Sequence, residues 1–305
     1  MQMKQSSIPT VLTIAGSDPI GGAGIQADLK TISAFHLYGM SVITAITAQN
    51  TQGVQAVYSL ESEIVEKQLD SVFTDIMPDC VKLGMLANEE IVEAVAKKLR
   101  QYKPKKIVID PIMVSSSGKE LLEPKGCNAM IEKLFPLATI ITPNLPEAQF
   151  LAKRKEQEGF QQGFMETERQ VIASLTEDTK KKAYWEMAEI IFSFFGNTIQ
   201  KEQAILIKGG HMQGLYAEDY LYCIEKNKRK ESFFTSPRLD NPNTHGTGCT
   251  LSSAIACGIA MGKTIEESVR LAKEYITGAI RGGLYIGKGI GPLDHFWNRT
   301  LKIEC

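Results

Sequence analysis

The sequence predicts an α/β protein with a mostly parallel central sheet, helices on both faces of that sheet and an antiparallel hairpin at one edge. Short β-branched apolar runs alternate with amphipathic helical patterns along most of the chain, and this alternation is typical of a parallel sheet with right-handed helical crossovers. Residues 219–225 and 231–235, joined by a basic turn, have the pattern of a hairpin instead.

The first half of the chain repeats a unit of strand, polar or glycine loop, and helix. A strand at 10–15 stops at the glycine loop 16–24, and a helical pattern starts at Ile25. The loop lacks the spacing of a dinucleotide fingerprint, so we interpret its glycines as room for a flat ligand close to the backbone. Further strands are expected at 41–47, 80–83, 106–110 and 139–147, and helices at 65–76 and after the N-cap Asn88.

The second half resumes the pattern after a polar, charged surface excursion at 153–179. A helix from Tyr184 closed by Gly196 precedes a strand at 204–208, and the hairpin follows. A helix of small residues at 250–261 is closed by Gly262, and Thr264 with Glu267 forms a capping box for the last helix. A final glycine loop occupies 287–292.

Length and charge favour one domain that acts on small molecules. The 305 residues suit a single α/β domain spanning 1–305, and the formal net charge is −1. Neither a basic nucleic-acid footprint nor a polybasic membrane anchor is present. Residues 1–9 are polar, and no run approaches the roughly 20 apolar residues of a membrane span. We therefore expect no nucleic-acid partner and no membrane association.

Six cysteines, at positions 80, 127, 223, 249, 257 and 305, form no C-x-x-C pair, and the four histidines are scattered. This distribution argues against a disulfide framework and against a zinc site. It fits the reducing cytoplasm.

Polar side chains arrive repeatedly where a predicted strand ends. The carboxyl ends of parallel strands share one edge of a sheet, so these side chains should lie along one rim. Carboxylates suit hydrated Mg²⁺, a lysine suits phosphate, and together they favour a phosphoryl-transfer site. The residues are Asp18, Gln49, Asp110, Asn144, Glu147 and Lys208.

Residues 241–254 crowd two glycines, a thiol and hydroxyls immediately before a helix. Gly246 and Gly248 allow backbone conformations in which the N–H groups of residues 246–249 converge at a helix N-terminus, a site for phosphate. A tight turn without a ligand is the alternative for a simple glycine pair.

Cys249 stands at this helix start, where the dipole and the N–H groups are expected to lower its pKa. A buried, inert cysteine is the alternative. His245 is near enough in sequence to raise a third reading, a Cys/His acyl-transfer pair, although such partners are usually adjacent in space and not in sequence.

Several motifs together resemble the ribokinase superfamily, and within it the hydroxymethylpyrimidine/phosphomethylpyrimidine kinases of thiamine biosynthesis. They run nearly end to end: Ala-Gly-Ser-Asp-Pro at 15–19, Gly-Gly-Ala-Gly-Ile-Gln-Ala-Asp-Leu-Lys at 21–30, Ala-Gln-Asn-Thr at 48–51, Thr-Pro-Asn-Leu-Pro-Glu at 142–147, Lys-Gly-Gly-His at 208–211, Asn-Thr-His-Gly-Thr-Gly-Cys-Thr at 243–250 and Gly-Lys-Gly-Ile-Gly-Pro at 287–292.

The resemblance implies a three-layer ribokinase-like fold and an ATP- and Mg²⁺-dependent kinase. Such an enzyme phosphorylates 4-amino-5-hydroxymethyl-2-methylpyrimidine and then phosphorylates the monophosphate. The implied substrate-binding residues are Gln49, Asp28 and Gly16. Those implied for ATP are Asn144, Glu147, Lys208 and Thr247, with Glu147 and Asp110 for the metal, and Cys249, Gly246, Gly248 and Lys208 for catalysis.

Two departures from the wider superfamily stand out. Most members carry Asp where this chain has Cys249, so the base assignment follows the pyrimidine-kinase subgroup. The excursion at 153–179 is longer than expected for the family.

The resemblance also implies a homodimer. Alternative functions are a pyridoxal or pyridoxine kinase, a non-catalytic pyrimidine-binding regulator and a cysteine acyl transferase.

Overall fold

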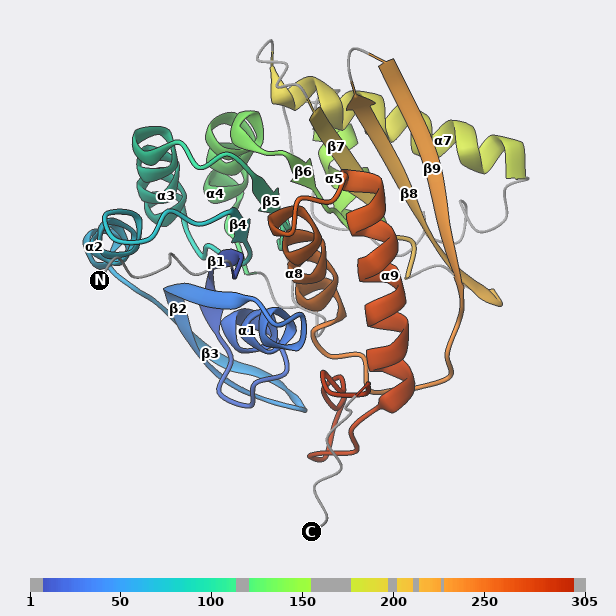
Figure 1. Cartoon of the computed structure of the whole chain (residues 1–305), viewed down its shortest axis with the longest axis horizontal. Helices are drawn as coiled ribbons and strands as arrows, with labels where there is room; N and C mark the ends of the chain where they lie inside the picture. Colours follow the sequence, from blue (N-terminus) through green and yellow to red (C-terminus); the bar gives the residue numbers. More distant parts are fainter. Residues whose placement is uncertain are drawn as a thin grey trace, which may run out of the picture.

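The computed structural model describes residues 8–113, 121–154, 177–196, 202–210, 214–225 and 228–298. Within these residues nine strands form one sheet in the order β3-β2-β1-β4-β5-β6-β7-β8-β9 (Figure 1). The strands are β1 (Thr10–Ser17), β2 (Tyr38–Asn50), β3 (Gly53–Ser59), β4 (Cys80–Leu83), β5 (Ile107–Ile109), β6 (Ile140–Ile141), β7 (Glu202–Ile207), β8 (Tyr216–Glu225) and β9 (Lys228–Pro237).

The centre of the sheet is parallel and both edges are antiparallel. Strands β2, β1, β4, β5, β6 and β7 pair in parallel. The predicted hairpin is confirmed as β8 and β9, which pair antiparallel beside β7. At the opposite edge β3 pairs antiparallel with β2, an arrangement that we did not predict because residues 48–53 look like a loop after a shorter strand.

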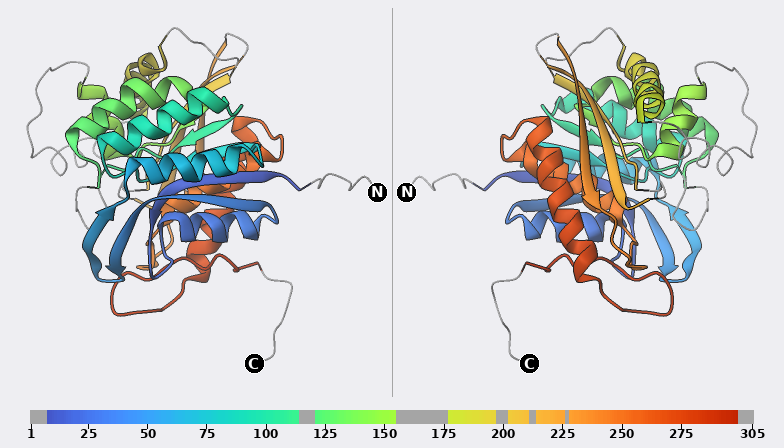
Figure 2. Two further views of the ribbon diagram at one scale, coloured as in Figure 1. Left: turned by 90° about the vertical axis from the view of Figure 1, so that its left-hand side faces the viewer. Right: turned by 90° about the vertical axis from the view of Figure 1, so that its right-hand side faces the viewer.

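Helices cover both faces of the sheet, as predicted. On one face lie α1 (Gly24–Ala34), α8 (Thr247–Ala260) and α9 (Ile265–Gly282), which pack in series against one another. The other face carries α2 (Ser62–Phe73), α3 (Glu89–Tyr102), α4 (Pro124–Ala129), α5 (Leu145–Arg154) and α7 (Glu177–Phe192). The side views show the sheet between the two helical layers (Figure 2).

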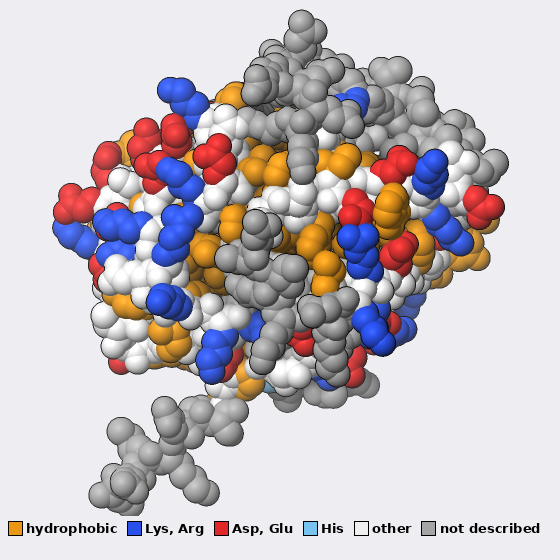
Figure 3. All heavy atoms as spheres, turned by 90° about the horizontal axis from the view of Figure 1, so that it is seen from above, with side chains coloured by type: hydrophobic (Ala, Val, Ile, Leu, Met, Phe, Trp, Pro, Cys, Tyr) orange, Lys and Arg blue, Asp and Glu red, His pale blue; other side chains and the backbone are white. Residues whose placement is uncertain are grey.

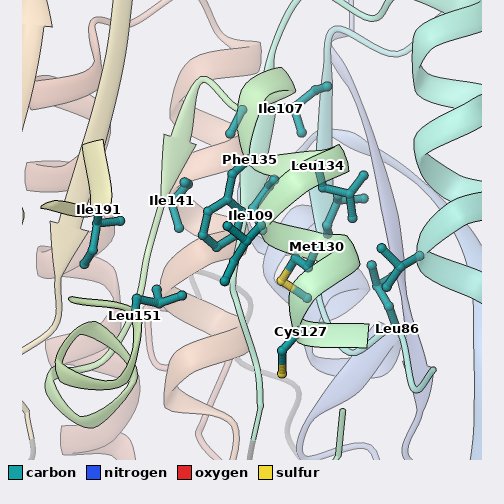
Figure 4. Packing of buried hydrophobic residues seen from close by; sticks show 14 of the residues in the cluster. Leu86, Ile107, Ile109, Cys127, Met130, Leu134, Phe135, Ile141, Leu151 and Ile191 are labelled. Carbon is teal, nitrogen blue, oxygen red and sulfur yellow. The ribbon is translucent and has the colours of Figure 1, made fainter. Parts of the chain in front are cut away.

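Each face of the sheet has its own hydrophobic core. Under α2 to α7 the side chains of β4, β5 and β6 alternate into a large apolar cluster, in which Ile109, Phe135 and Ile141 pack together (Figure 4). A second cluster lies under α1, α8 and α9 and includes Val108 and Ile140, whose side chains point to the opposite face from their neighbours. Period-two alternation in the short central strands thus supplies both cores.

Local sequence signals place several helix ends. The Asn88 side chain accepts a hydrogen bond from the Ile91 N–H at 3.0 Å and caps α3. Thr264 and Glu267 form the predicted capping box of α9. Gly262 follows α8 with φ +80°, a left-handed conformation that glycine adopts without strain.

The structure changes several predicted element boundaries and adds elements that were not predicted. Strand β6 contains Ile140–Ile141 only, and Glu147 lies in the first turn of α5, because Pro143 and Asn144 end the strand and start a helix. Helix α8 begins at Thr247, so Gly248 and Cys249 are in its first turn and not in the preceding loop. The short helices of 124–137, a π turn and a 3-10 turn after α4, were not predicted.

The described part of the chain contains no helix both long and apolar enough to cross a membrane. Acidic and basic side chains are mixed on the face shown in Figure 3, so neither sign forms a continuous patch there. Most of the predicted excursion at 153–179 lies outside the described residues, between α5 and α7. The single-domain assignment to 1–305 stays a prediction.

Candidate active site

The site forms where the order of the strands reverses. The chain leaves β1 for β2 and β3 and then returns to β4 on the other side of β1. In open α/β sheets the carboxyl ends of the strands beside such a reversal leave a crevice for ligands. Helix α8 packs against β1, β4 and β5, so its N-terminal turn belongs to the same region.

Gly246 caps α8 in a conformation that requires glycine. Its φ is +85°, and a Cβ at this position would lie 1.9 Å from the carbonyl oxygen of Gly22. The glycine loop after β1 and the start of α8 are therefore in direct backbone contact. The first N–H groups of a helix have no partner within the helix, although that of Thr247 donates to the Thr244 carbonyl at 3.3 Å. An anion site at this turn of α8 stays a prediction.

Lys208 and Asp110 form an ion pair beside this turn. The Lys208 Nζ lies 2.6 Å from Asp110 Oδ1, with the side chains 12% and 1% exposed. A Cβ on Gly248 would lie 3.5 Å from Lys208 Nζ and 3.6 Å from Asp110 Oδ2. Burial lowers the pKa of Lys208, but Asp110 and Glu147 outweigh that effect and raise it, so the ammonium keeps its charge next to the helix start.

Asn144 and Glu147 hold each other at the start of α5. The Asn144 N–H donates to Glu147 Oε2 at 2.7 Å, and the Glu147 N–H donates to Asn144 Oδ1 at 2.9 Å, a reciprocal capping arrangement. Burial raises the pKa of Glu147 to about 7; Lys208 opposes the rise and Asp110 adds to it. A cation bound near the carboxylates of Glu147 and Asp110 would offset the repulsion between them.

The prediction that Cys249 has a lowered pKa is wrong. Its thiol is buried, and burial raises the pKa to about 11. Lys82 and a hydrogen bond from Gly24 act in the lowering direction, but Asp28 and Asp110 add negative charge nearby. Desolvation thus exceeds the helix-terminus effect, and the group at this position is a neutral thiol at pH 7.

Asp28 is fully enclosed and does not reach the open part of the site. Its oxygens accept hydrogen bonds from Lys82 at 2.8 and 3.0 Å, from Thr13 at 2.6 Å and from Ser253 at 2.7 Å. Both Asp28 and Lys82 are 0% exposed. Because these protein groups enclose the carboxylate, the expected contact between Asp28 and substrate does not fit the structure. The carboxylate instead links β1, β4, α1 and α8.

Lys82 is the residue of this region that the sequence analysis missed. It lies in β4, and the surrounding carboxylates Asp28 and Asp110 overcome the cost of burial and raise its pKa. A single charge inside the otherwise apolar run Cys-Val-Lys-Leu at 80–83 was the available signal. Buried lysines almost always have a charged partner.

Gln49, at the end of β2, meets His245 from the loop before α8. Its Nε2 lies 2.9 Å from His245 Nε2, and Asp18 Oδ2 lies 3.2 Å from the same ring nitrogen. The three residues come from separate segments of the chain. Of the predicted rim residues, the structure places Gln49 and Asp18 beside His245. It places Lys208 beside Asp110, and Asn144 beside Glu147.

Gly16 is closely packed against protein atoms, and its expected contact with substrate stays a prediction. A Cβ there would lie 2.6 Å from the terminal methyl of Met85, and one on Gly24 would lie 2.3 Å from the Gly16 carbonyl oxygen. Close packing within the loop therefore explains these glycines. Thr247, the first residue of α8, is half-buried beside them.

The C-terminal glycine loop closes against the β2–β3 turn, as the side view shows (Figure 2). The Thr51 hydroxyl accepts hydrogen bonds from the N–H groups of Lys288 at 3.1 Å and Gly289 at 3.0 Å, and the Thr51 carbonyl accepts from Ile290 at 2.9 Å. A Cβ on Gly289 would lie 2.1 Å from that carbonyl oxygen, so the close approach requires glycine.

A resident metal cage does not occur among the described residues, which include no group of three His, Cys, Asp or Glu side chains placed to hold an ion. The available donors are the carboxylates of Glu147 and Asp110. Mg²⁺ in phosphoryl-transfer sites uses one or two carboxylates plus water and substrate phosphates, so these donors fit an ion that arrives with a nucleotide.

The fold and the site together define a small-molecule kinase that uses ATP. One edge of the sheet in this three-layer fold carries a lysine, two acidic side chains and a glycine-capped helix start, which suit phosphoryl transfer. The chain also matches the model of the phosphomethylpyrimidine kinase family over residues 18–179 and 167–294. It belongs to this family, as the sequence resemblance predicted.

Relatives agree in sequence and in fold. The chain is 43% identical over 291 residues to the hydroxymethylpyrimidine/phosphomethylpyrimidine kinase of Salmonella typhimurium, covering 93% of this chain and 96% of that protein. The crystal structure of phosphomethylpyrimidine kinase from Clostridium difficile is 43% identical, with a TM-score of 0.67 over 89% of this chain and 99% of that one. The pyridoxal kinase from Staphylococcus aureus, solved with AMP-PCP and pyridoxal, is 32% identical with a TM-score of 0.77, covering 97% and 96%.

Proposed function

We propose that this chain phosphorylates the hydroxymethyl group of 4-amino-5-hydroxymethyl-2-methylpyrimidine and then phosphorylates the monophosphate to the diphosphate, in thiamine biosynthesis. The observation that carries the proposal is the meeting of Lys208 and Asp110 with the first turn of α8, next to Gln49 and His245. The names and 43% identity of the relatives support the pyrimidine as the substrate class.

Lys208 and the N–H groups at the start of α8 would bind the phosphate oxygens and stabilise the charge that develops during transfer. The hydroxyl oxygen of the substrate forms the new bond to the γ-phosphorus, and the bond from that phosphorus to ADP breaks. Asn144 and Thr247 would complete the binding of ATP. Glu147, with Asp110, would hold Mg²⁺, which supplies charge neutralisation on the phosphates when it is bound.

Cys249 would accept the proton of the substrate hydroxyl only as a thiolate, which is a small minority form at pH 7 because its pKa is about 11. As a thiol it would steer that proton to water or to a phosphate oxygen. Transfer through a loose transition state needs the proton only late, when the hydroxyl has become acidic. A base that assists without being essential is consistent with this order of events.

The decisive experiment is ADP release measured with the hydroxymethylpyrimidine, its monophosphate and the vitamin B6 alcohols and aldehyde. Turnover with both pyrimidines, at a higher kcat/KM than with any vitamin B6 form, supports the proposal. Higher kcat/KM for pyridoxal overturns it in favour of a pyridoxal kinase. Lys208→Met, with the exposed Lys67→Met as its matched control, separates this activity from a contaminating kinase.

We also propose a homodimer in the cytoplasm. Family resemblance and the exposed edge strand β3, where Tyr58 is 65% exposed beside Ile46 on β2, support a self-association surface. The five described cysteines are buried thiols, which fits a reducing compartment. Light scattering should give twice the chain mass, and Tyr58→Lys should reduce it to that of one chain.

A further inference from the structure

The imidazole of His245 lies between two side chains that make opposite demands on one atom. The Gln49 amide nitrogen is 2.9 Å from His245 Nε2, and Asp18 Oδ2 is 3.2 Å from it. An amide N–H can only donate, so it needs a lone pair on Nε2, whereas a carboxylate needs a hydrogen there. One ring nitrogen cannot satisfy both.

Asp18 is held as an ionised acceptor. Its Oδ2 accepts hydrogen bonds from the N–H groups of Gly22 at 2.9 Å and Ala23 at 2.8 Å, and its Oδ1 accepts from Ile20 at 3.1 Å. Burial raises the pKa of Asp18, but these hydrogen bonds and His245 outweigh it and lower the pKa. A hydrogen bond to an ionised carboxylate is stronger than one between neutral groups, so Asp18 decides where the hydrogen of His245 lies.

The imidazole has little freedom to escape this choice. A Cβ on Gly22 would lie 2.4 Å from His245 Cδ2, so the ring packs directly on the glycine loop. The backbone N–H of His245 donates to the Gly291 carbonyl at 3.3 Å, which fixes the main chain at this residue. Gln49 is the more adaptable partner, because its amide oxygen and nitrogen have nearly the same shape and exchange places by one side-chain rotation.

We propose that Asp18 keeps a hydrogen on His245 Nε2, and that the Gln49 amide turns so that its oxygen shares this hydrogen with Asp18 in a three-centre hydrogen bond and its nitrogen points away. His245 and Asp18 are then positioning residues for specificity. This inference rests on the proposed function, in which Gln49 reads an aminopyrimidine. Such a ring offers a donor, its amino group, beside an acceptor, its ring nitrogen.

A fixed order of acceptor and donor on Gln49 selects one of the two ways in which that ring can lie against it. The selected orientation determines which ring carbon faces Lys208 and α8. The wrong order would place two donors or two acceptors against each other and leave them unpaired. The pair Asp18 and His245 thus connects the glycine loop to the choice of the phosphorylated position.

The test is ¹⁵N nuclear magnetic resonance of the protein labelled at its four histidines, with the His245 signals assigned by their loss in His245→Gln. The proposal expects the hydrogen on Nε2. A hydrogen on Nδ1 with a bare Nε2 overturns it. This measurement needs neither substrate nor ATP, so it is independent of whether the proposed kinase activity is found.

Two variants identify the residue that sets the tautomer. Gln49→Met should leave the hydrogen on Nε2, and Asp18→Asn should move a measurable fraction of it to Nδ1. The reverse pattern contradicts the proposal. Should Asp18→Asn fail to fold, the wild-type and Gln49→Met spectra still decide.

Kinetics then test the role in specificity. His245→Leu should raise KM for the hydroxymethylpyrimidine roughly tenfold or more and change KM for ATP by less than about twofold, because only the Gln49 contact is misdirected. Equal changes in both KM values indicate general damage to the site and overturn the specificity role. Absence of pyrimidine turnover in the wild type would sink the proposed function and leave the tautomer result standing.

Discussion

Glu147→Gln should make the stability of this protein less sensitive to rising pH. In the folded chain the pKa of Glu147 is raised from 4.5 to about 7, first by burial and then by Asp110, against the opposing effect of Lys208. The folded state therefore binds more protons than the unfolded state between these two values. Stability contributed by this group falls as pH rises through that window.

The magnitude follows from the difference between the two pKa values. At about 1.36 kcal/mol per pH unit, ionising Glu147 in the folded protein costs about 3 kcal/mol once the pH exceeds 7. At pH 5 the group is protonated in the folded state, and the cost is only about 1 kcal/mol. Between pH 5 and pH 8 the variant should gain about 2 to 3 kcal/mol of unfolding free energy relative to wild type, because glutamine has the same shape without the charge.

Urea unfolding of wild type and Glu147→Gln at pH 5 and pH 8, without nucleotide or Mg²⁺, measures how the difference in unfolding free energy between the two proteins changes with pH. Glu63→Gln is the control: Glu63 is exposed and its pKa is lowered by a hydrogen bond from Lys67, so that variant should show no gain at high pH. A Glu147→Gln protein whose stability changes in parallel with wild type between the two pH values would refute the reasoning. The wild-type affinity for Mg²⁺ with ATP should also rise with pH over the same window, because Glu147 must lose its proton.

Three further predictions concern the reaction. Gln49→Ala should raise KM for the pyrimidine at least about tenfold and leave KM for ATP nearly unchanged, because the amide hydrogen-bonds to the ring and contacts no phosphate. Steady-state kinetics with each substrate varied in turn checks this prediction, and an unaltered pyrimidine KM contradicts it. Lys208→Ala should lower kcat by ~10² to 10³ because charge on the transferred group loses its ammonium, and wild-type turnover at saturating ATP would show that Lys208 has no part in the chemistry. Cys249 should react slowly with iodoacetamide at pH 7 and faster as the pH approaches its pKa of about 11, and rapid labelling at pH 7 would contradict this. Cys249→Ser should turn over more slowly than wild type with little change in ATP binding. Full activity in both Cys249→Ser and Cys249→Ala would contradict that expectation.

The order of most strands and helices is predictable because those elements have a local cause, with β3 and the short helices of 124–137 as exceptions. Alternating apolar runs mark the buried strands, Asn88 and Thr264 carry their own capping chemistry, and glycines follow the helices that they end. The rule that parallel strands end at one edge predicts that Asp110, Lys208 and Glu147 lie close together. Their meeting in the structure confirms that rule for this chain.

Burial and long-range pairing required the tertiary structure. The helix start predicts a lowered pKa for Cys249, but the thiol lies in a desolvated interior where burial dominates. Asp28 looks like a polar residue near a ligand loop, yet Lys82, 54 residues away, encloses it in an ion pair. The residues next to Cys249 and Asp28 in the sequence show neither effect, and the only local signal is the lone charge of Lys82 in its apolar run.

The sequence by itself determined the class of fold and the kinase family, and it predicts a phosphate site at residues 241–254. These depend on local periodicity and on contiguous motifs, which a single chain displays directly. Only the tertiary structure decided which polar groups face a ligand and which face one another, as in the contact of His245 with both Gln49 and Asp18. That division is physical, because hydrogen-bond partners and solvent exposure are set by segments that meet in space only after folding.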